Sequence, residues 1–565
     1  MPSRPSIVIP SDPLRQRLRR HGPALLFLLA LALYLALTLY QIELPGPNYD
    51  EAVEAKPAIQ WLRGLPVEAH RDAVVHLLGR PLPLMVVDYV GALNTYVLLL
   101  FFKLGGIGVA SMRLWPILVG AVILWLTYRL AAEWLGMGAA LLAAFLLAVQ
   151  PSFVFFSRQG IYVTNTTIAF SLAILLLLLR LVHRGRMRAW YGSWFLAGLG
   201  LWAKFIMLWP LAATAILSPV VWWRRRLFGL DVADDFHPRR LLHPRALLAA
   251  LAAFLVGLSP FLLFNLKTGA TFSHFLGTLD RSYYGVQNTD YLHNLQIRWQ
   301  QIGDFLKGNH FWYLGGNFVD RLAWPAWLFS FVLLNLMPAV SRGEKSTQIA
   351  ARRGLLFYVF FLLLLLQTPL TPTALWYTHL ALFSPVLALA TAAGWALLCD
   401  RLPRRLGLSL MIALGLALVS GGLQTDLQYH RALAASGGYA DHSDAIYRLG
   451  ETLLDEGIYS PYALDWGFEA PLILVTRGEV NPIEIFGYER FDAPDPGFAD
   501  RLRPLLQDPG SIFLLHAPDR TNFGGRREAL QALAEDLGVR LQTVAVVYER
   551  SGAPHTEILR PAAPQ

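Results

Sequence analysis

The sequence Asn48-Tyr49-Asp50-Glu51-Ala52 follows the first long apolar run of the chain, which extends from His21 to Tyr40. A run of about 20 apolar residues is long enough to cross a bilayer as one helix. The arginines before it would suit a secretory signal peptide, but no small-x-small cleavage pattern follows. We therefore expect a retained membrane span, with two adjacent acidic residues shortly after its end.

The acidic pair has two interpretations that this stretch alone leaves open. Asn48 suits an N-cap, and Asp50 and Glu51 would then lie in a first helical turn, where the helix dipole favours negative charge. Acidic residues at a bilayer boundary are also frequent functional groups. The topology described below favours the second interpretation for Asp50.

The composition indicates a membrane protein with many spans. Hydrophobic residues make up 55% of the 565 residues and charged residues only 15%, whereas soluble proteins carry about 25% charged residues. The net charge of +9 comes from Lys and Arg in short loops between apolar runs, which is a topology signal and argues against nucleic-acid binding. The single cysteine, Cys399, cannot form an intrachain disulfide.

Apolar segments of span length recur along the chain, and the positive-inside rule orders them. The shorter run from Leu93 to Leu104 is interrupted by Asn94 and Lys103. If this run does not cross, the basic loops between later spans all lie on the same side as the basic N-terminal tail. We therefore place it along the outer face and expect about eleven spans. These are residues 22–42, 112–133, 137–156, 162–182, 190–206, 207–223, 246–266, 323–340, 354–370, 377–398 and 405–423.

The predicted fold is a polytopic α-helical membrane protein with about 11 transmembrane helices and a C-terminal soluble α/β domain. The expected localisation is the cell (inner or plasma) membrane. The expected parts are a cytoplasmic tail (1–21), a transmembrane module (22–424) with extracytoplasmic loops at 43–111 and 267–322, and an extracytoplasmic domain (425–565). Residues 51–62 are expected to form an amphipathic helix. In the C-terminal domain, strands are expected near 470–476, 483–486, 511–516 and 544–548, and helices near 443–456, 498–506 and 526–537.

Three basic side chains lie on the outer side of this predicted topology. Arg158 is the only charge of the loop 151–165, Lys204 interrupts apolar sequence at an outer turn, and His379 lies in a short outer turn. Each also has a structural interpretation, because arginine can anchor a span at the interface and a lone histidine is at least as often structural. An outer arginine runs against the positive-inside rule, which favours an anionic partner.

Several short strings occur in a particular order along these spans. They are Tyr49-Asp50-Glu51, Met112-Arg113-Leu114-Trp115-Pro116, Gln150-Pro151 followed by Ser157-Arg158, Gly198 to Lys204, and His379 to Pro385. Together with the topology they resemble the GT-C membrane glycosyltransferases, in the branch of protein O-mannosyltransferases and the lipid A aminoarabinose transferase. The resemblance covers about residues 15–425. It implies transfer of a sugar from a polyprenyl-phosphate donor to an acceptor hydroxyl on the extracytoplasmic face, with inversion.

The resemblance implies that Asp50 is the general base, with Glu51 as a second candidate catalytic residue. The reaction needs a carboxylate near the acceptor hydroxyl and cations near the departing phosphate, for which Arg158, Lys204 and His379 are the candidates. No second acid follows Ser157-Arg158, so we expect no metal ligands and no obligatory cofactor. Further candidate substrate contacts are Tyr49, Arg80, Tyr89, Tyr162 and Tyr283.

The expected partners are the membrane, a polyprenyl-phosphate-linked sugar, and an acceptor that is a protein, a lipid or a glycan. The alternative is a non-catalytic flippase accessory or carrier for lipid-linked sugars. A transporter would carry ionisable residues in mid-span and broken helices in paired halves. Here the charges singled out lie at outer boundaries, which favours an enzyme.

Overall fold

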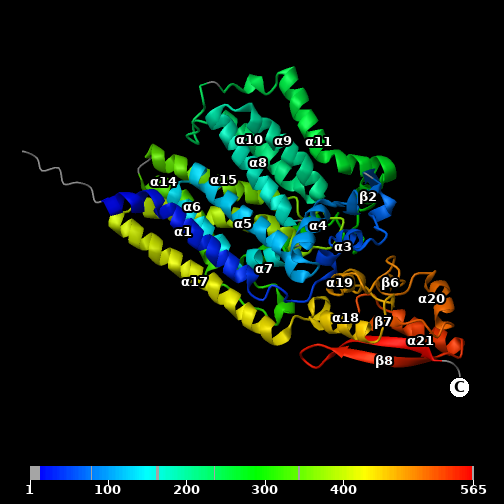
Figure 1. The fold of residues 1–565 in the computed structure, drawn as a ribbon. Helices are drawn as coiled ribbons and strands as arrows, with labels where there is room; N and C mark the ends of the chain where they lie inside the picture. The colour runs from blue at the N-terminus through cyan, green and yellow to red at the C-terminus, as the bar shows by residue number, and fades with distance from the viewer. Residues whose placement is uncertain (1–12, 78, 161–163, 235, 342–343, 563–565) are drawn as a thin grey trace, which may run out of the picture.

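The computed structural model describes residues 13–77, 79–160, 164–234, 236–341 and 344–562. Figure 1 shows a bundle of long helices with the C-terminal domain at one end. Within the described residues, nine helices are long and apolar enough to cross a membrane, which confirms the predicted polytopic fold. They are α1 (Pro13–Leu39), α5 (Val109–Trp134), α8 (Thr164–Arg184), α10 (Leu208–Trp223) with η3 (Phe205–Met207), α11 (Pro244–Thr268), α14 (Ala323–Val340), α15 (Lys345–Leu365), α16 (Ser384–Asp400) with η6 (Tyr377–Phe383), and α17 (Arg404–Ser436).

The other two predicted spans have a different form. The segment 137–156 is a pair of helices, α6 (Met137–Ala148) and α7 (Pro151–Gln159), bent by 60°. Pro151 begins α7, because proline lacks the backbone N–H that a continuous helix would use there. The segment 190–206 is α9 (Met187–Ala203), of 17 residues. In the described chain the count is therefore nine, or up to ten with the bent pair, instead of about eleven.

Helices α9 and α11 pack backbone to backbone through glycines. A Cβ atom on Gly198 would lie 2.1 Å from the carbonyl oxygen of Phe254, and one on Gly257 would lie 2.4 Å from the carbonyl oxygen of Phe195. No side chain fits at either position, which is the small-residue packing common between membrane helices. This contact holds the two helices in one arrangement along their length.

The loop between α1 and α5 folds over one end of the bundle. The expected amphipathic helix at 51–62 is divided into α2 (Tyr49–Ala52) and α3 (Lys56–Arg63). Helix α4 (Leu93–Gly105) has 13 residues, too few to cross a bilayer, and packs against α3 and α5. The loop also contains η1 (His70–Asp72), β1 (Val74–Leu77), β2 (Arg80–Pro83), β3 (Met85–Val87) and β4 (Val90–Gly91), and the later loops contain η4 (Pro238–Arg240), α12 (Ala270–Gly277), α13 (Tyr291–Lys307) and η5 (Trp312–Leu314).

The C-terminal domain is a five-stranded sheet with flanking helices, which confirms the predicted α/β class. The strand order is β6-β5-β7-β9-β8; β5 is parallel to both its neighbours and β9 is antiparallel to both of its own. Helix α17 continues past residue 424 to Ser436 and leads into it. The elements are η7 (Ala440–His442), α18 (Ala445–Asp455), β5 (Tyr462–Ala463), α19 (Glu469–Val475), β6 (Ile483–Glu484), α20 (Phe498–Leu506), β7 (Phe513–His516), α21 (Arg526–Asp536), β8 (Arg540–Tyr548) and β9 (Pro554–Ala562).

The prediction of a strand at 470–476 is wrong, because this segment is helix α19. Its apolar side chains are buried on all sides between the sheet and the first loop, and a short apolar run of this kind does not distinguish a strand from a buried helix. The other three predicted strands correspond to β6, β7 and β8, and the three predicted helices to α18, α20 and α21. The sequence analysis missed β5 and β9.

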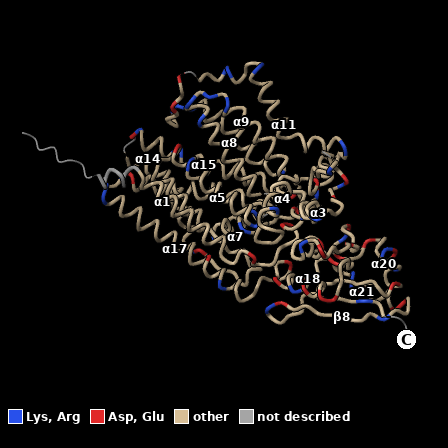
Figure 2. The backbone as a smooth tube through the Cα atoms, viewed as in Figure 1, with Lys and Arg blue, Asp and Glu red and all other residues tan. Residues whose placement is uncertain are grey.

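The C-terminal domain packs on the first loop. Helix α19 contacts α2 and α3, and Lys56 donates to Glu469 across the interface at 2.7 Å. Figure 2 shows Lys and Arg positions gathered at the opposite end of the bundle, around the loops that connect α8 to α9, α10 to α11 and α14 to α15. The first loop and the C-terminal domain therefore lie at one end and the arginine-rich loops at the other, as the sequence predicted.

Candidate functional site

The stretch that begins α2 is held by a capping box. The Asn48 side chain accepts a hydrogen bond from the Asp50 backbone N–H at 2.9 Å, and the Glu51 carboxylate accepts one from the Asn48 backbone N–H at 3.0 Å. Asn48 is therefore the N-cap of α2, as the helix-start interpretation expected, and the capping box satisfies backbone N–H groups at the N-terminus of this helix. It does not account for the Asp50 carboxylate, which makes neither of these bonds.

Glu51 forms a buried ion pair with Arg113 on α5. The guanidinium Nη2 lies 2.5 Å from Glu51 Oε1 and Nε lies 3.0 Å from Oε2, and both side chains are almost fully buried. Arg113 also donates to the carbonyl oxygens of Ile42 and Pro45, each at 2.9 Å. This pair fixes the chain between α1 and α2 on α5, so Glu51 holds the loop in place.

The Asp50 carboxyl lies among other ionisable groups. Burial by the surrounding protein raises the pKa of Asp50 to about 6, Lys204 opposes this rise, and Asp441 of the C-terminal domain adds to it. Part of the Asp50 side chain is still accessible to solvent. A carboxyl that is desolvated by neighbours yet reachable can exchange a proton with a bound molecule near neutral pH.

Two groups beside Asp50 belong to the same electrostatic cluster. Burial raises the pKa of Glu54 to about 8, a hydrogen bond from Asn94 and the Lys204 charge act against the rise, and the Asp50 charge adds to it. Burial also raises the pKa of Tyr283; its hydrogen-bond partner Tyr89 and the Asp50 charge add to that effect. The cluster therefore brings together three residues that were singled out in the sequence, Asp50, Lys204 and Tyr283.

Lys204 lies at the break between α9 and η3, where the chain is extended. It forms an isolated β-bridge with Val90, and its ammonium group donates to Thr164 Oγ1 at 2.9 Å. The bridge joins the membrane helices to the first loop. It places the ammonium group near Asp50 while the side chain itself is buried.

Lys204 and His379 line one cavity of about 380 Å³ at this end of the bundle. Tyr89 also lines it, so three of the predicted site residues meet there. His379 Nδ1 lies 3.1 Å from Nη2 of Arg298 on α13, which positions the imidazole ring. Other polar groups on the wall are the side chains of Thr278, Asn288, Gln367, Thr371 and Thr373.

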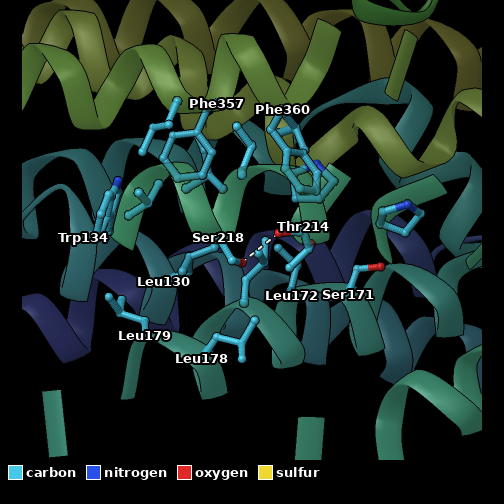
Figure 3. A pocket seen from close by; sticks show the side chains of 18 of the residues that line it. Leu130, Trp134, Ser171, Leu172, Leu178, Leu179, Thr214, Ser218, Phe357 and Phe360 are labelled. Atoms are coloured by element: carbon cyan, nitrogen blue, oxygen red, sulfur yellow. Dashed lines mark hydrogen bonds between the residues drawn. The ribbon is translucent and has the colours of Figure 1, made fainter. Parts of the chain in front are cut away.

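A separate apolar pocket of about 200 Å³ lies within the bundle. Its wall is close to that of the cavity along the chain, because Pro210 of the pocket directly follows Trp209 of the cavity, and Leu364 of the pocket precedes Leu366 of the cavity by two residues. Figure 3 shows the pocket walls, with side chains from α5, α8, α10 and α15 pointing inward. The labelled side chains are Leu130, Trp134, Ser171, Leu172, Leu178, Leu179, Thr214, Ser218, Phe357 and Phe360.

Arg158 does not line this cavity. Its guanidinium is fully buried on α7 and donates to the carbonyl oxygens of Gln41 and Leu44, the latter at 3.0 Å, beside His430 of α17. The geometry thus gives no support to the prediction that Arg158 binds the donor phosphate. It instead fixes the end of α1 against α7.

The remaining predicted substrate contacts are dispersed. Tyr49 packs against Trp466 of the C-terminal domain, with ring centroids 4.9 Å apart. The Tyr89 and Tyr283 hydroxyls lie 3.1 Å apart at the cavity. Arg80 stacks over Trp61, 5.5 Å from the ring centroid, away from the cluster. Tyr162 lies outside the described residues.

Four groups near the site were given no role by sequence reasoning. They are Glu54, Arg113, Arg298 and Asp441. Glu54 could have been found, because it follows Asp50 by one helical turn. Arg298 and Asp441 come from distant segments without a local signal. In the part of the chain that the structure describes, no group of three or more His, Cys, Asp or Glu side chains could hold a metal ion.

Comparison with known proteins gives the following matches. A family model described as dolichyl-phosphate-mannose-protein mannosyltransferase matches residues 91–264. ArnT from Cupriavidus metallidurans bound to undecaprenyl phosphate is 13% identical, with 95% of this chain and 98% of that chain covered and a TM-score of 0.59. The apo form of the same ArnT is also 13% identical, with 96% of this chain and 98% of that chain covered and a TM-score of 0.58. The oligosaccharyltransferase AglB from Archaeoglobus fulgidus is 13% identical, with 93% of this chain and 69% of that chain covered and a TM-score of 0.48.

No curated protein sequence matches the chain. The structural likeness to ArnT extends over nearly the whole of both chains, and the family model matches the stretch from β4 into α11. The predicted GT-C-like fold with a C-terminal soluble domain is therefore confirmed.

Proposed function

We propose that the protein is a membrane glycosyltransferase that moves a sugar from a polyprenyl-phosphate donor to an acceptor hydroxyl. The observation that carries the proposal is the order of groups along the bundle. Asp50 interacts with Lys204, Lys204 lines the polar cavity, and an apolar pocket lies farther into the bundle, where its Pro210 directly follows Trp209 of the cavity wall. A base, a phosphate-binding cation and lipid-compatible walls occur in the order that such a donor requires.

Asp50 acts as the general base. It takes the proton of the acceptor hydroxyl while the hydroxyl oxygen attacks the anomeric carbon of the donor. The bond between that carbon and the phosphate oxygen breaks, and its electron pair leaves with the polyprenyl phosphate. A single displacement inverts the anomeric centre. With a pKa of about 6, Asp50 is mostly ionised at neutral pH yet basic enough to accept a proton.

Lys204 and His379 bind the phosphate. Negative charge builds on the phosphate as the sugar departs, so a fixed ammonium group stabilises the transition state more than the ground state. Arg298 orients His379 and adds positive charge behind it. The polyprenyl chain extends into the apolar pocket between α8, α10 and α15. ArnT, which has the same fold, binds undecaprenyl phosphate in its solved structure.

The reaction takes place at the end of the bundle that carries the first loop and the C-terminal domain. We assign this end to the extracytoplasmic face and the N-terminus to the cytoplasm. The support is the gathering of arginines at the opposite end, which the positive-inside rule assigns to the cytoplasm.

The test compares Asp50→Asn with Asp72→Asn, a matched control at an exposed acid of the same loop. Transfer is measured by mass spectrometry of glycans and lipid-linked sugars in cells, and donor binding by native mass spectrometry of the purified chain. Asp50→Asn should lose transfer and retain donor binding, whereas Asp72→Asn should retain both. Undiminished transfer by Asp50→Asn would remove Asp50 from the mechanism. Donor binding by the wild type without any transfer would favour the carrier instead.

A further inference from the structure

A second cavity, of about 400 Å³, lies at the opposite end of the bundle from Asp50. We propose that it binds the phosphate headgroup of an anionic phospholipid. Four of its wall residues are basic, and they come from η4 and from the start of α11. The wall consists of Met187, Tyr191, Arg239, Arg240, His243, Arg245 and Ala246.

Two helix N-termini converge on this cavity. α9 begins at Met187 and α11 at Pro244, and residues of both first turns line the wall. The close contact through Gly198 and Gly257 holds these helices together, so their positive dipole ends lie side by side. At the start of α11 His243 already accepts the hydrogen bonds of the first backbone N–H groups, so an anion there would be favoured by the helix dipoles and the arginine side chains.

The arginines of the cavity wall differ in their pairing from other arginines at the same end of the bundle. In the described part of the chain, no ion pair joins Arg239, Arg240 or Arg245 to a carboxylate. By contrast, Arg180 and Arg401 at the same end pair with Glu133 and Glu344. Positive charge at a helix N-terminus is unfavourable. An anion in the cavity relieves both the dipoles and the mutual repulsion of the arginines.

The surface beside the cavity indicates a lipid as the source of the anion. Leu242 and Leu248 are 70% and 66% exposed, on either side of the α11 start. Tyr191 on the cavity wall is of the type that lies at membrane interfaces. A headgroup in the cavity would let its acyl chains cover these leucines, which free phosphate cannot do. Basic pockets between membrane helices bind anionic headgroups in this manner.

The test uses the purified full chain in a neutral detergent and native mass spectrometry. The probes are phosphatidylglycerol, phosphatidylcholine and inorganic phosphate. The cavity variant is R239Q/R240Q/R245Q, and the matched control is R224Q/R225Q/R226Q, which removes the same charge at the same end but outside the cavity wall. We expect the wild type and the control to prefer phosphatidylglycerol, and the cavity variant to bind it roughly 100-fold more weakly.

A single variant, Arg245→Gln, keeps the proposal testable if the triple variant does not fold. It removes a cation from the first turn of α11, which should not weaken that helix. We expect roughly fivefold weaker phosphatidylglycerol binding. Equal losses in the cavity and control variants would overturn the proposal, because general charge would then explain binding. Undiminished binding by both cavity variants, or tight phosphate binding without any preference between the two lipids, would also overturn it.

Discussion

Replacing Glu51 by Gln should lower the free energy of unfolding by about 3–5 kcal/mol, because it leaves a buried charge without its partner. The Arg113 side chain is 0% exposed and that of Glu51 5% exposed. The variant removes the carboxylate charge from a two-point contact of 2.5 and 3.0 Å. Arg113 keeps its bonds to the carbonyls of Ile42 and Pro45, so we expect the lower end of the range, about 3 kcal/mol.

The measurement is SDS-induced unfolding of the purified protein in mixed micelles. The double variant Glu51→Gln/Arg113→Met should cost less than the sum of the two single variants, with a coupling of about 1–3 kcal/mol. The control, Arg63→Gln, breaks an exposed pair with Glu479 and should cost less than about 1 kcal/mol. If Glu51→Gln cost no more than this control and abolished transfer, Glu51 would act in the chemistry and the structural role would be refuted.

Three further outcomes are expected. The transfer rate at saturating donor should fall about tenfold per unit as the pH drops well below 6, because the raised pKa of Asp50 protonates the base; a pH–rate profile measures this. Lys204→Met should lower kcat/KM for the donor about 10–100-fold in initial-rate assays, whereas Lys103→Met, at an exposed lysine of α4, should leave it unchanged. Leu172→Trp should fill the apolar pocket and weaken long-chain donors while sparing short-chain analogues; equal effects on both would contradict the assignment of the pocket to the lipid chain.

The end of the bundle at which each charge lies could be predicted from the sequence. Apolar run lengths and the bias of arginines among loops are local properties, and they placed Asp50, Lys204 and His379 at the same end of the bundle. The structure agrees, since Lys204 interacts with Asp50 and lines a cavity with His379. The α/β class of the C-terminal domain could also be predicted from the sequence, although the buried helix α19 is predicted as a strand.

Which side chain faces the cavity was decided only by the tertiary structure. Arg158 is on α7 as the order of spans suggests, but its guanidinium donates to the carbonyls of Gln41 and Leu44 and does not line the cavity. Glu51 is adjacent to Asp50 in sequence, yet it pairs with Arg113 of α5. Sequence alone thus indicated at which end of the bundle Asp50 lies. Its proton affinity depends on groups brought from distant segments, Lys204 and Asp441, because desolvation and Coulomb interactions depend on distance in space.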